Sequence, residues 1–285
     1  MRFDLHTHST ASDGTLSPAD LVHYAHDAGL AAIALTDHDS VDGIPEALTT
    51  ASRLNAGGSQ LLVIPGVELS AVHSGRDVHI LGYFVDHTHP GLLTRLRDLR
   101  TARGNRARAI VTSLRAAGYE IELDEVLALS DGGAVGRSHV ARALVGRGHA
   151  ADVSDAFKRL LGRGQPFYLT KDVRTPAEVL RTVLDAGGLP VLAHPGVTGV
   201  DDLIGALVDE GLVGIEAYHS EHDHEQEERY SALAAQYGLL ITGGTDFHGP
   251  DAPNPPLGSI AMPSDLLERL LHAGGRGVLH SSGDD

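Results

Sequence analysis

Seven short apolar segments that alternate with stretches of helical periodicity constrain the fold of this chain most strongly. The expected strands span residues 3–6, 32–36, 61–67, 78–84, 189–194, 213–218 and 239–246. Several of them are continuous runs of Val, Ile, Leu and Ala, which is typical of parallel strands that are buried on both faces. The alternation therefore predicts an α/β fold, a distorted (β/α)7 barrel.

The first expected helix is capped by Ser17, has Pro18 at its first position and ends at Gly29. The other helices expected around the barrel cover residues 43–54, 176–186, 201–209, 223–237 and 263–271. Between residues 92 and 165 the alternation stops, and only helices are expected, at 91–117, 123–130, 138–147 and 153–161. We therefore expect a barrel domain formed by residues 1–91 and 166–285, with an all-helical cap subdomain inserted at 92–165.

Composition limits the kind of site that such a barrel can carry. The chain has no cysteine, which excludes disulfides and thiolate metal sites. A metal would have to be bound by imidazole and carboxylate groups, which suit Mn, Zn and Fe. No apolar stretch approaches the roughly 18 residues of a membrane-spanning helix, and no signal peptide precedes the first strand, so we expect a cytoplasmic protein.

The charge of the chain is unevenly distributed. A net charge of −16 argues against a protein that coats DNA. Residues 95–171 nevertheless contain 14 Lys or Arg against 8 Asp or Glu, a net charge of +6, which leaves −22 for the rest. The basic segment is interpreted either as solvated helix faces or as a cap that attracts an anionic substrate. Part of the acidic remainder would bind cations.

Residues able to bind a metal occur at or near the ends of the expected strands, where barrel active sites are built. In the segment FDLHTH, His6 and His8 alternate onto the same side of an extended chain. His79 lies inside the apolar segment VHILGY, where an imidazole is costly unless it has a partner such as a metal. The remaining candidates are Asp13, Asp37, His38, Asp39, Glu68, His194, Glu216, His219, Asp246 and His248.

The motifs HTHSTASDGT, LTDHDSVDGI, IPGVELSA, VHILGY, LAHPG and GGTDFHG follow one another in this order along the chain. In these motifs the chain resembles the polymerase and histidinol phosphatase (PHP) family over the whole barrel. The resemblance implies a distorted seven-stranded (β/α) barrel and a hydrolase of phosphate esters. It also implies two or three divalent metal ions, with Mn expected first and Zn or Fe as the alternatives.

The resemblance implies which residues bind these ions. One metal would be bound by His6, His8, Glu68 and Asp246. A second would be bound by Glu68, His79 and His194, and a third by Asp13, His38 and His248. Glu68 would then bridge the first two metals. All of these positions hold the residue type that the family requires.

The helical insertion after the fourth strand is similar to the family branch that acts on nucleoside 3′,5′-bisphosphates and short 5′-phosphorylated oligonucleotides. By that resemblance Arg137, His139 and Lys171 are expected to bind the substrate, because an Arg fork and a Lys charge suit phosphate. The alternative for Arg137 is an exposed arginine at a helix terminus. The expected partner is thus a small phosphorylated nucleotide or short oligonucleotide, without long DNA, a membrane or an obligate protein partner.

The resemblance also suggests a mechanism. A metal-bound hydroxide is expected to attack phosphorus in line with the leaving oxygen. His219 is expected to contact the phosphate or to protonate the leaving group, and Asp37 is the alternative general acid. Neither residue is a predicted metal ligand, and both are expected to lie next to the site.

Other functions stay open at this point. A phosphatase for histidinol phosphate or another small molecule would share the barrel and the metals but would not need a basic cap. A processive nuclease would need a basic groove lined with aromatic side chains, and only 4% of the residues are aromatic. The complete ligand set disfavours a non-catalytic metal-binding module. An amidohydrolase-like enzyme commonly has a bridging lysine, but the two lysines, Lys158 and Lys171, do not end a barrel strand.

Overall fold

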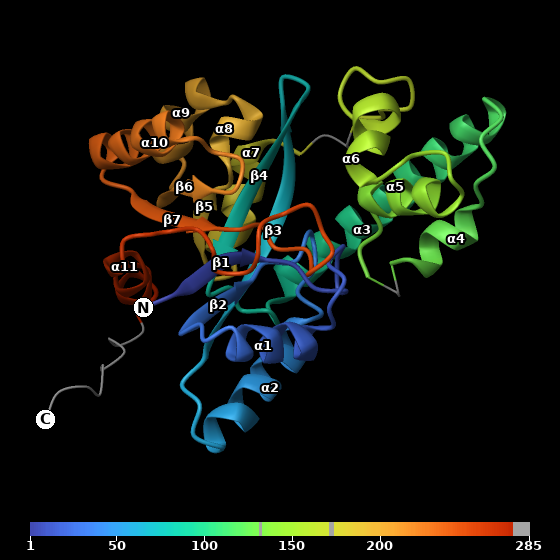
Figure 1. Ribbon diagram of the computed structural model, residues 1–285. Coiled ribbons are helices and arrows are strands. Elements are labelled where there is room, and N and C mark those ends of the chain that lie inside the picture. The colour runs from blue at the N-terminus through green and yellow to red at the C-terminus, as the bar shows by residue number, and fades with distance from the viewer. Residues whose placement is uncertain (131–132, 171–173, 276–285) are drawn as a thin grey trace, which may run out of the picture.

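The computed structural model describes residues 1–130, 133–170 and 174–275 (Figure 1). Its centre is a sheet of seven strands in the order β1-β2-β3-β4-β5-β6-β7. A bridge between Thr7 and Phe247 and hydrogen bonds between the same two segments bring the chain after the last strand back beside the first. The sheet is thus nearly closed into a barrel with helices around it, which confirms the predicted α/β fold.

All seven predicted strands are present. Their bounds are β1 (Phe3–Thr7), β2 (Ala32–Leu35), β3 (Leu62–His73), β4 (Arg76–Tyr83), β5 (Leu189–Leu192), β6 (Gly214–His219) and β7 (Leu240–Gly244). Most of their Val, Ile, Leu and Ala side chains are buried, as in a sheet that is covered on both faces.

The direction of β4 differs from the prediction of a parallel sheet. β4 pairs antiparallel with both β3 and β5, whereas the remaining neighbours pair in parallel. β3 continues past its predicted end, and a two-residue turn at Ser74 and Gly75 leads directly into β4. Both turn residues have positive φ, 49° and 73°, as the tight turns of hairpins require. Glu68 therefore lies in the middle of β3, and the reversed β4 brings His79 beside it.

The helices of the barrel are α1 (Pro18–Asp27), α2 (Ile44–Ala56), α7 (Pro176–Asp185), α8 (Pro195–Thr198), α9 (Ile204–Asp209), α10 (His224–Tyr237) and α11 (Asp265–Ala273), with a 3-10 turn η2 (Asp201–Leu203). The predicted start of α1 is confirmed, since the Ser17 side chain accepts the N–H of Asp20 and Pro18 opens the helix. Four leucines of α11 pack with Leu5 and Tyr83 in the apolar cluster of the barrel interior.

The insertion after β4 is helical, as predicted. It consists of α3 (Pro90–Ala116), α4 (Leu123–Ala128), α5 (Arg137–Gly146), α6 (Val153–Ala156) and a π-helical turn η1 (Phe157–Leu161). Figure 1 shows α4, α5 and α6 as a separate layer beside the barrel. Helix α3 belongs to both parts, because Leu96 and Leu99 pack in the barrel core whereas Ala107 and Ile110 pack in the core of the cap. The expected domain boundary at residue 92 stays a prediction.

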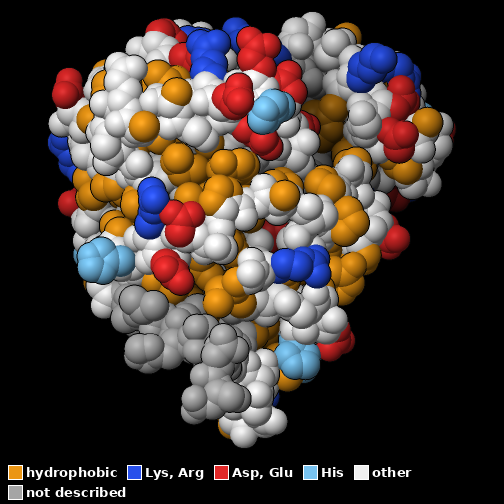
Figure 2. All heavy atoms as spheres, turned by 60° about the vertical axis from the view of Figure 1, so that its left-hand side comes forward, with side chains coloured by type: hydrophobic (Ala, Val, Ile, Leu, Met, Phe, Trp, Pro, Cys, Tyr) orange, Lys and Arg blue, Asp and Glu red, His pale blue; other side chains and the backbone are white. Residues whose placement is uncertain are grey.

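The surface of the molecule carries charged and apolar side chains, as the composition of the chain leads one to expect. Among the residues that the structure describes, no helix has the length and apolar character needed to cross a membrane. Figure 2 shows a face of the molecule with broad apolar areas across its middle and with side chains of both charges, many of them along its upper edge. Lys and Arg side chains are scattered over this face and do not form a continuous basic track of the kind that long nucleic acids need.

Candidate metal centre

The nine side chains that the sequence analysis treats as ligands gather at one end of the barrel. Their first group consists of His6, His8, Glu68 and Asp246, whose ligand atoms all lie within 4.8 Å of one another. Oε2 of Glu68 lies 3.3 Å from Nε2 of His6 and 3.4 Å from Nε2 of His8. Oδ1 of Asp246 lies 3.3 and 3.0 Å from the same two nitrogens.

These separations fit a bound ion. Two ligand atoms at roughly 2.0–2.1 Å from a tetrahedral metal are about 3.3 Å apart. Among the buried atoms that make no hydrogen bond of normal geometry within the described ranges are six atoms of the expected ligands: His6 Nε2, His8 Nε2, Asp13 Oδ1, His38 Nδ1, Glu68 Oε2 and Asp246 Oδ1. Buried polar atoms that make no hydrogen bond are rare because they are costly, and divalent ions would satisfy these atoms. The donor set therefore fits a metal centre.

Glu68 connects this group to a second one. Its other oxygen, Oε1, lies 2.6 Å from Nδ1 of His79 and 3.1 Å from Nε2 of His194. Oε2 lies 2.9 Å from Nδ1 of His38. The fully buried carboxylate thus has neighbours on both sides, which is the arrangement that a bridging ligand requires.

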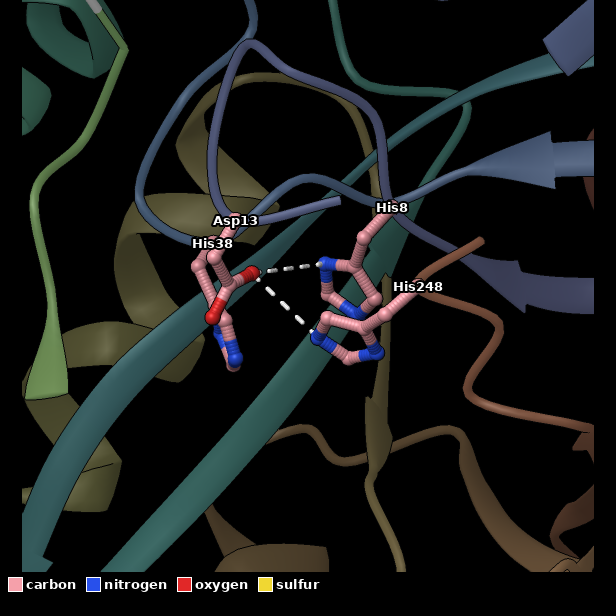
Figure 3. Close-up of side chains that lie close together, drawn as sticks. All are labelled: His8, Asp13, His38 and His248. Atoms are coloured by element: carbon pink, nitrogen blue, oxygen red, sulfur yellow. Dashed lines mark ion pairs between the residues drawn. The ribbon is translucent and has the colours of Figure 1, made fainter. Parts of the chain in front are cut away.

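Asp13 forms a third group with His8, His38 and His248. Figure 3 shows the Asp13 carboxylate pointing between the rings of His8 and His248, with Oδ1 3.9 Å from Nδ1 of His8 and 3.2 Å from Nε2 of His248. Its second oxygen accepts a hydrogen bond of 2.7 Å from the hydroxyl of Ser138 at the start of α5. The cap therefore contacts this group directly.

Mutual electrostatics keep the carboxylates of the site ionised. Burial alone raises the pKa of Glu68, but the imidazoles of His38, His79 and His6 lower the pKa well below its usual value. The same balance holds the pKa of Asp13 low, with burial opposed first by His248 and His38. In turn burial lowers the pKa of His248, but Asp13 and Asp246 raise it to about 10. The cluster is therefore preorganised for cations by negative charge that is already present.

Buried polar contacts position the loops that carry these ligands. Asp37 accepts hydrogen bonds from the Ser9 N–H, the Ser9 hydroxyl and the Ser12 hydroxyl, at 2.7, 2.7 and 2.6 Å. These bonds tie the loop after β1 to the loop after β2. His194 and Asp246 have φ values of 27° and 54°, which are rare for residues other than glycine and tend to occur at functional sites.

Glu216 is a part of the site to which the sequence analysis assigned no role. Its side chain is fully buried, and Oε1 lies 2.9 Å from Nδ1 of His6. Oε2 accepts the backbone N–H of His194 at 2.8 Å. The signal that was available is its place in the segment EAYHS at the end of β6, which put it among the candidates.

The two candidates for proton transfer have different surroundings. Nδ1 of His219 accepts the N–H of Glu221 at 3.1 Å, so the proton of a neutral ring lies on Nε2. That Nε2 is buried and lies 3.8 Å from Oδ2 of Asp246. Burial raises the pKa of Asp37, although the hydroxyls of Ser12 and Ser9 lower it, and both of its oxygens already accept hydrogen bonds.

The three residues expected to bind substrate have different surroundings, and one of them lines the cavity. Arg137 lines a cavity above the ligands, together with Asp13, His38 and His79. His139 is buried, and its Nδ1 accepts the N–H of Gly136 at 3.0 Å, so it contributes to the N-terminus of α5. Lys171 lies outside the described residues. Their roles in substrate binding stay predictions.

The cavity contains two more cationic residues that the sequence analysis did not single out. Its volume is about 100 Å³, and Arg103 and Arg106 of α3 line its cap side. The sequence did not indicate which of the 14 Lys and Arg residues in 95–171 face the barrel, since that depends on how α3 is rotated against β3.

Comparison with known proteins agrees with this geometry. Residues 4–164 match the family model described as the PHP domain. The chain is 36% identical to the 5′-3′ exoribonuclease Rnm of Salmonella typhimurium, over 87% of this chain and 85% of the relative. It is 33% identical to the 3′,5′-nucleoside bisphosphate phosphatase of Chromobacterium violaceum, over 87% of each chain.

A solved structure supports the same assignment. It is a protein of Bifidobacterium adolescentis that is described as a metal-dependent phosphoesterase. The two structures superimpose with a TM-score of 0.87 and 32% sequence identity, over 95% of each chain. The chain therefore belongs to the PHP family, and it is a metal-dependent hydrolase of phosphate esters.

Proposed function

We propose that this enzyme cleaves the bond between phosphorus and the 3′-oxygen of nucleotides that also carry a 5′-phosphate. Its substrates are nucleoside 3′,5′-bisphosphates, short 5′-phosphorylated oligonucleotides, or both. In the first the 3′-phosphate leaves as inorganic phosphate, and in the second the first residue leaves the chain. Both reactions yield a nucleoside 5′-monophosphate. The names of the Salmonella and Chromobacterium relatives describe these two activities.

The observation that carries this proposal is the cavity between barrel and cap. Its barrel side consists of Asp13, His38 and His79, which belong to the candidate ligand groups. Its cap side carries three arginines. A substrate with two anionic groups matches this division, because one group would be neutralised at the barrel and the other at the cap.

We infer that two or three divalent ions occupy the three ligand groups, with Mn expected first and Zn or Fe as alternatives. The ligands would be His6, His8, Asp13, His38, Glu68, His79, His194, Asp246 and His248. When bound, these ions would supply an activated water for attack on phosphorus and would offset the charge of the phosphate. Oxygen and nitrogen donors in this mixture suit all three metals.

We assign to His219 a hydrogen bond from Nε2 to the phosphate or to the leaving 3′-oxygen, because a neutral imidazole donates a hydrogen bond but is too weak an acid to give up its proton. Its Nε2 carries the proton of the neutral ring and lies beside Asp246. Asp37 is the alternative acid, but its two oxygens accept three hydrogen bonds from the loop after β1, which favours a positioning role. Arg137 and Ser138 lie on the cap side of the cavity, where they would orient the substrate.

The cavity between barrel and cap has a volume of about 100 Å³, which suits a small anionic group better than a long nucleic acid. We therefore propose a nucleotide or short oligonucleotide as the partner. Residues 92–165 would act as the cap that binds its second anionic group.

Product release with added Mn²⁺ tests this proposal. The substrates to compare are adenosine 3′,5′-bisphosphate, 5′-AMP, a short 5′-phosphorylated RNA and histidinol phosphate. We expect turnover of the bisphosphate, of the RNA or of both, and none of 5′-AMP, which lacks a 3′-phosphate. Preference for histidinol phosphate would overturn the substrate assignment and leave the metal-dependent barrel intact.

A further inference from the structure

His222 is a buried histidine that is not one of the nine predicted ligands. It lies in the turn between β6 and α10, and both nitrogens of its ring have partners. Nδ1 lies 2.8 Å from the carbonyl oxygen of Ala217, and Nε2 lies 3.1 Å from the backbone nitrogen of Gly196. The ring therefore connects the end of β6 to the segment that follows β5.

These two contacts define the state of the ring. A carbonyl oxygen can only accept a hydrogen bond, so Nδ1 carries a proton. Burial lowers the pKa of His222 more than the hydrogen bond to Ala217 raises it, so the ring is neutral at pH 7. Nε2 therefore keeps its lone pair and accepts the N–H of Gly196. That N–H lies in the first turn of α8, where the helix itself offers no acceptor.

The backbone at Gly196 packs closely against the ring. A Cβ at this position would lie 2.8 Å from Cδ2 and 2.9 Å from Nε2 of His222, and it would also lie 2.7 Å from Nε2 of Gln226. Such distances are too short for a carbon atom, so glycine is required for this approach. Gln226 adds a weak hydrogen bond of 3.4 Å to the Gly196 carbonyl oxygen, and its own Oε1 accepts the N–H of Asp223.

The segment that is held in this way carries a predicted ligand in a strained conformation. His194 has φ 27° and ψ 57°, and such a backbone persists only where the surrounding contacts hold it. Before this residue Glu216 accepts the His194 N–H, and after it His222 holds the peptide of Gly196. The result is that Nε2 of His194 lies 3.1 Å from Oε1 of Glu68.

The ring of His222 is supported in turn by α10. The buried ring of Tyr230 lies against it, with 5.2 Å between the ring centres. The Tyr230 hydroxyl donates a hydrogen bond of 2.9 Å to Asp201, which follows α8. On the other side the ring of His219 lies 5.4 Å away. A side chain that is packed from both sides keeps one position, as an outer partner of a ligand must.

We propose that His222 is a positioning residue, which accepts the Gly196 N–H, holds the strained segment of His194 and so directs this imidazole toward its metal ion. Gln226 assists by binding the carbonyl oxygen of the same residue. His222 itself contacts neither the metal nor the substrate. The inference rests on the proposed metal centre and is independent of which phosphate ester is cleaved.

The test compares two amides of different length. In His222→Gln the side-chain oxygen can take the place of Nε2 and accept the Gly196 N–H. In His222→Asn the shorter amide reaches only the place of Nδ1 and can keep the bond to Ala217. We expect His222→Asn and His222→Ala to weaken one bound Mn²⁺ ion by about tenfold, while His222→Gln stays within about threefold of wild type. Metal content after equilibrium dialysis against graded Mn²⁺ concentrations measures this, and the other ions should stay bound.

Gly196 offers a second test. Gly196→Ala should weaken the same ion, because the added Cβ would displace the ring of His222. In the His222→Ala background that space is open, so the same change should have a smaller effect than in wild type. Additive effects of the two substitutions would show that the residues act separately, and would overturn the inference.

Amide hydrogen exchange in the metal-free enzyme provides a readout that needs neither an ion nor turnover. The Gly196 N–H should exchange about tenfold faster in His222→Asn than in wild type, and at nearly the wild-type rate in His222→Gln. His224→Ala is the matched control, because His224 is an exposed histidine at the start of α10, and it should behave as wild type.

Equal metal affinities of the Gln and Asn variants, or wild-type exchange of Gly196 in His222→Asn, would overturn the inference. If the wild-type enzyme bound no Mn²⁺, the proposed metal centre would fail. Exchange at Gly196 would then still decide whether His222 holds the segment of His194.

Discussion

Oε1 of Glu216 lies 2.9 Å from Nδ1 of His6, and neither side chain is exposed to solvent. Because Nδ1 must carry the proton that it donates, the lone pair of Nε2 is directed toward Glu68 and Asp246. The second oxygen of Glu216 accepts the backbone N–H of His194. One buried carboxylate, which is not among the nine predicted ligands, thus orients two of them.

The first prediction concerns this carboxylate. Glu216→Ala should lower the affinity for Mn²⁺ by about 10- to 100-fold, because a ligand histidine loses the group that fixes its tautomer. Glu216→Gln should lower it less, since the amide oxygen still accepts one of the two hydrogen bonds. Metal affinity is measured by equilibrium dialysis, with the exposed Glu221→Ala on the following loop as the control. Wild-type affinity in Glu216→Ala would contradict a positioning role.

The second prediction links the cap to the third ligand group. Ser138 of α5 donates to Oδ2 of Asp13, and Arg142 donates to the Asp13 carbonyl oxygen. Ser138→Ala should weaken the most weakly bound of the metal ions by about tenfold while the others stay bound. Metal content after dialysis against graded Mn²⁺ concentrations measures this. The exposed Ser154→Ala in the same cap should behave as wild type, and a uniform loss of all ions would argue against a local effect.

The third prediction is a pH dependence at His139. Burial lowers the pKa of His139 to about 4, with the charges of Arg142 and Arg103 lowering it further against the opposing charge of Asp13, and the neutral ring accepts the Gly136 N–H. The unfolded chain binds this proton at higher pH, near 6.5, so the contribution of neutral His139 to stability is complete above about pH 6.5. It is lost as the pH falls from there toward 4.

This loss should be absent in His139→Asn, whose amide oxygen accepts the same N–H and does not titrate. We expect the free energy of unfolding of the wild type to fall by about 2 kcal/mol more than that of the variant between pH 7 and pH 4.5. Urea unfolding at both pH values measures the difference, in which the titration of all other histidines cancels. If the free energies of unfolding of wild type and variant changed in parallel with pH, His139 would bind no proton on unfolding and the prediction would be wrong.

Much of the fold follows from local patterns. The seven strands were predictable because each is a short segment with buried apolar residues, several of them continuous runs of Val, Ile, Leu or Ala, for example 61–67 before and within β3. The direction of β4 was missed, since a buried apolar run does not encode its orientation. A signal existed in the dipeptide Ser74–Gly75, which is typical of a tight hairpin turn.

The candidate site was predictable to the extent that its residues lie in motifs. His6, His8 and Asp246 occupy strand ends, where the fold brings them together. Arg103 and Arg106 could not be singled out, because they are two of many arginines and their place in the cavity depends on the rotation of α3. The hydrogen bonds of Glu216 to His6 and His194 connect strands that are distant in sequence, so their partners become visible in three dimensions.

The central claim is that the clustered imidazoles and carboxylates bind the ions on which phosphate ester hydrolysis depends. Titrating the metal-depleted enzyme with Mn²⁺, while phosphate release from adenosine 3′,5′-bisphosphate is followed, tests it most directly. We predict no turnover without metal, saturation at two to three equivalents and no recovery in His6→Ala. Turnover in the metal-depleted enzyme, or near-normal turnover of His6→Ala, would contradict the claim.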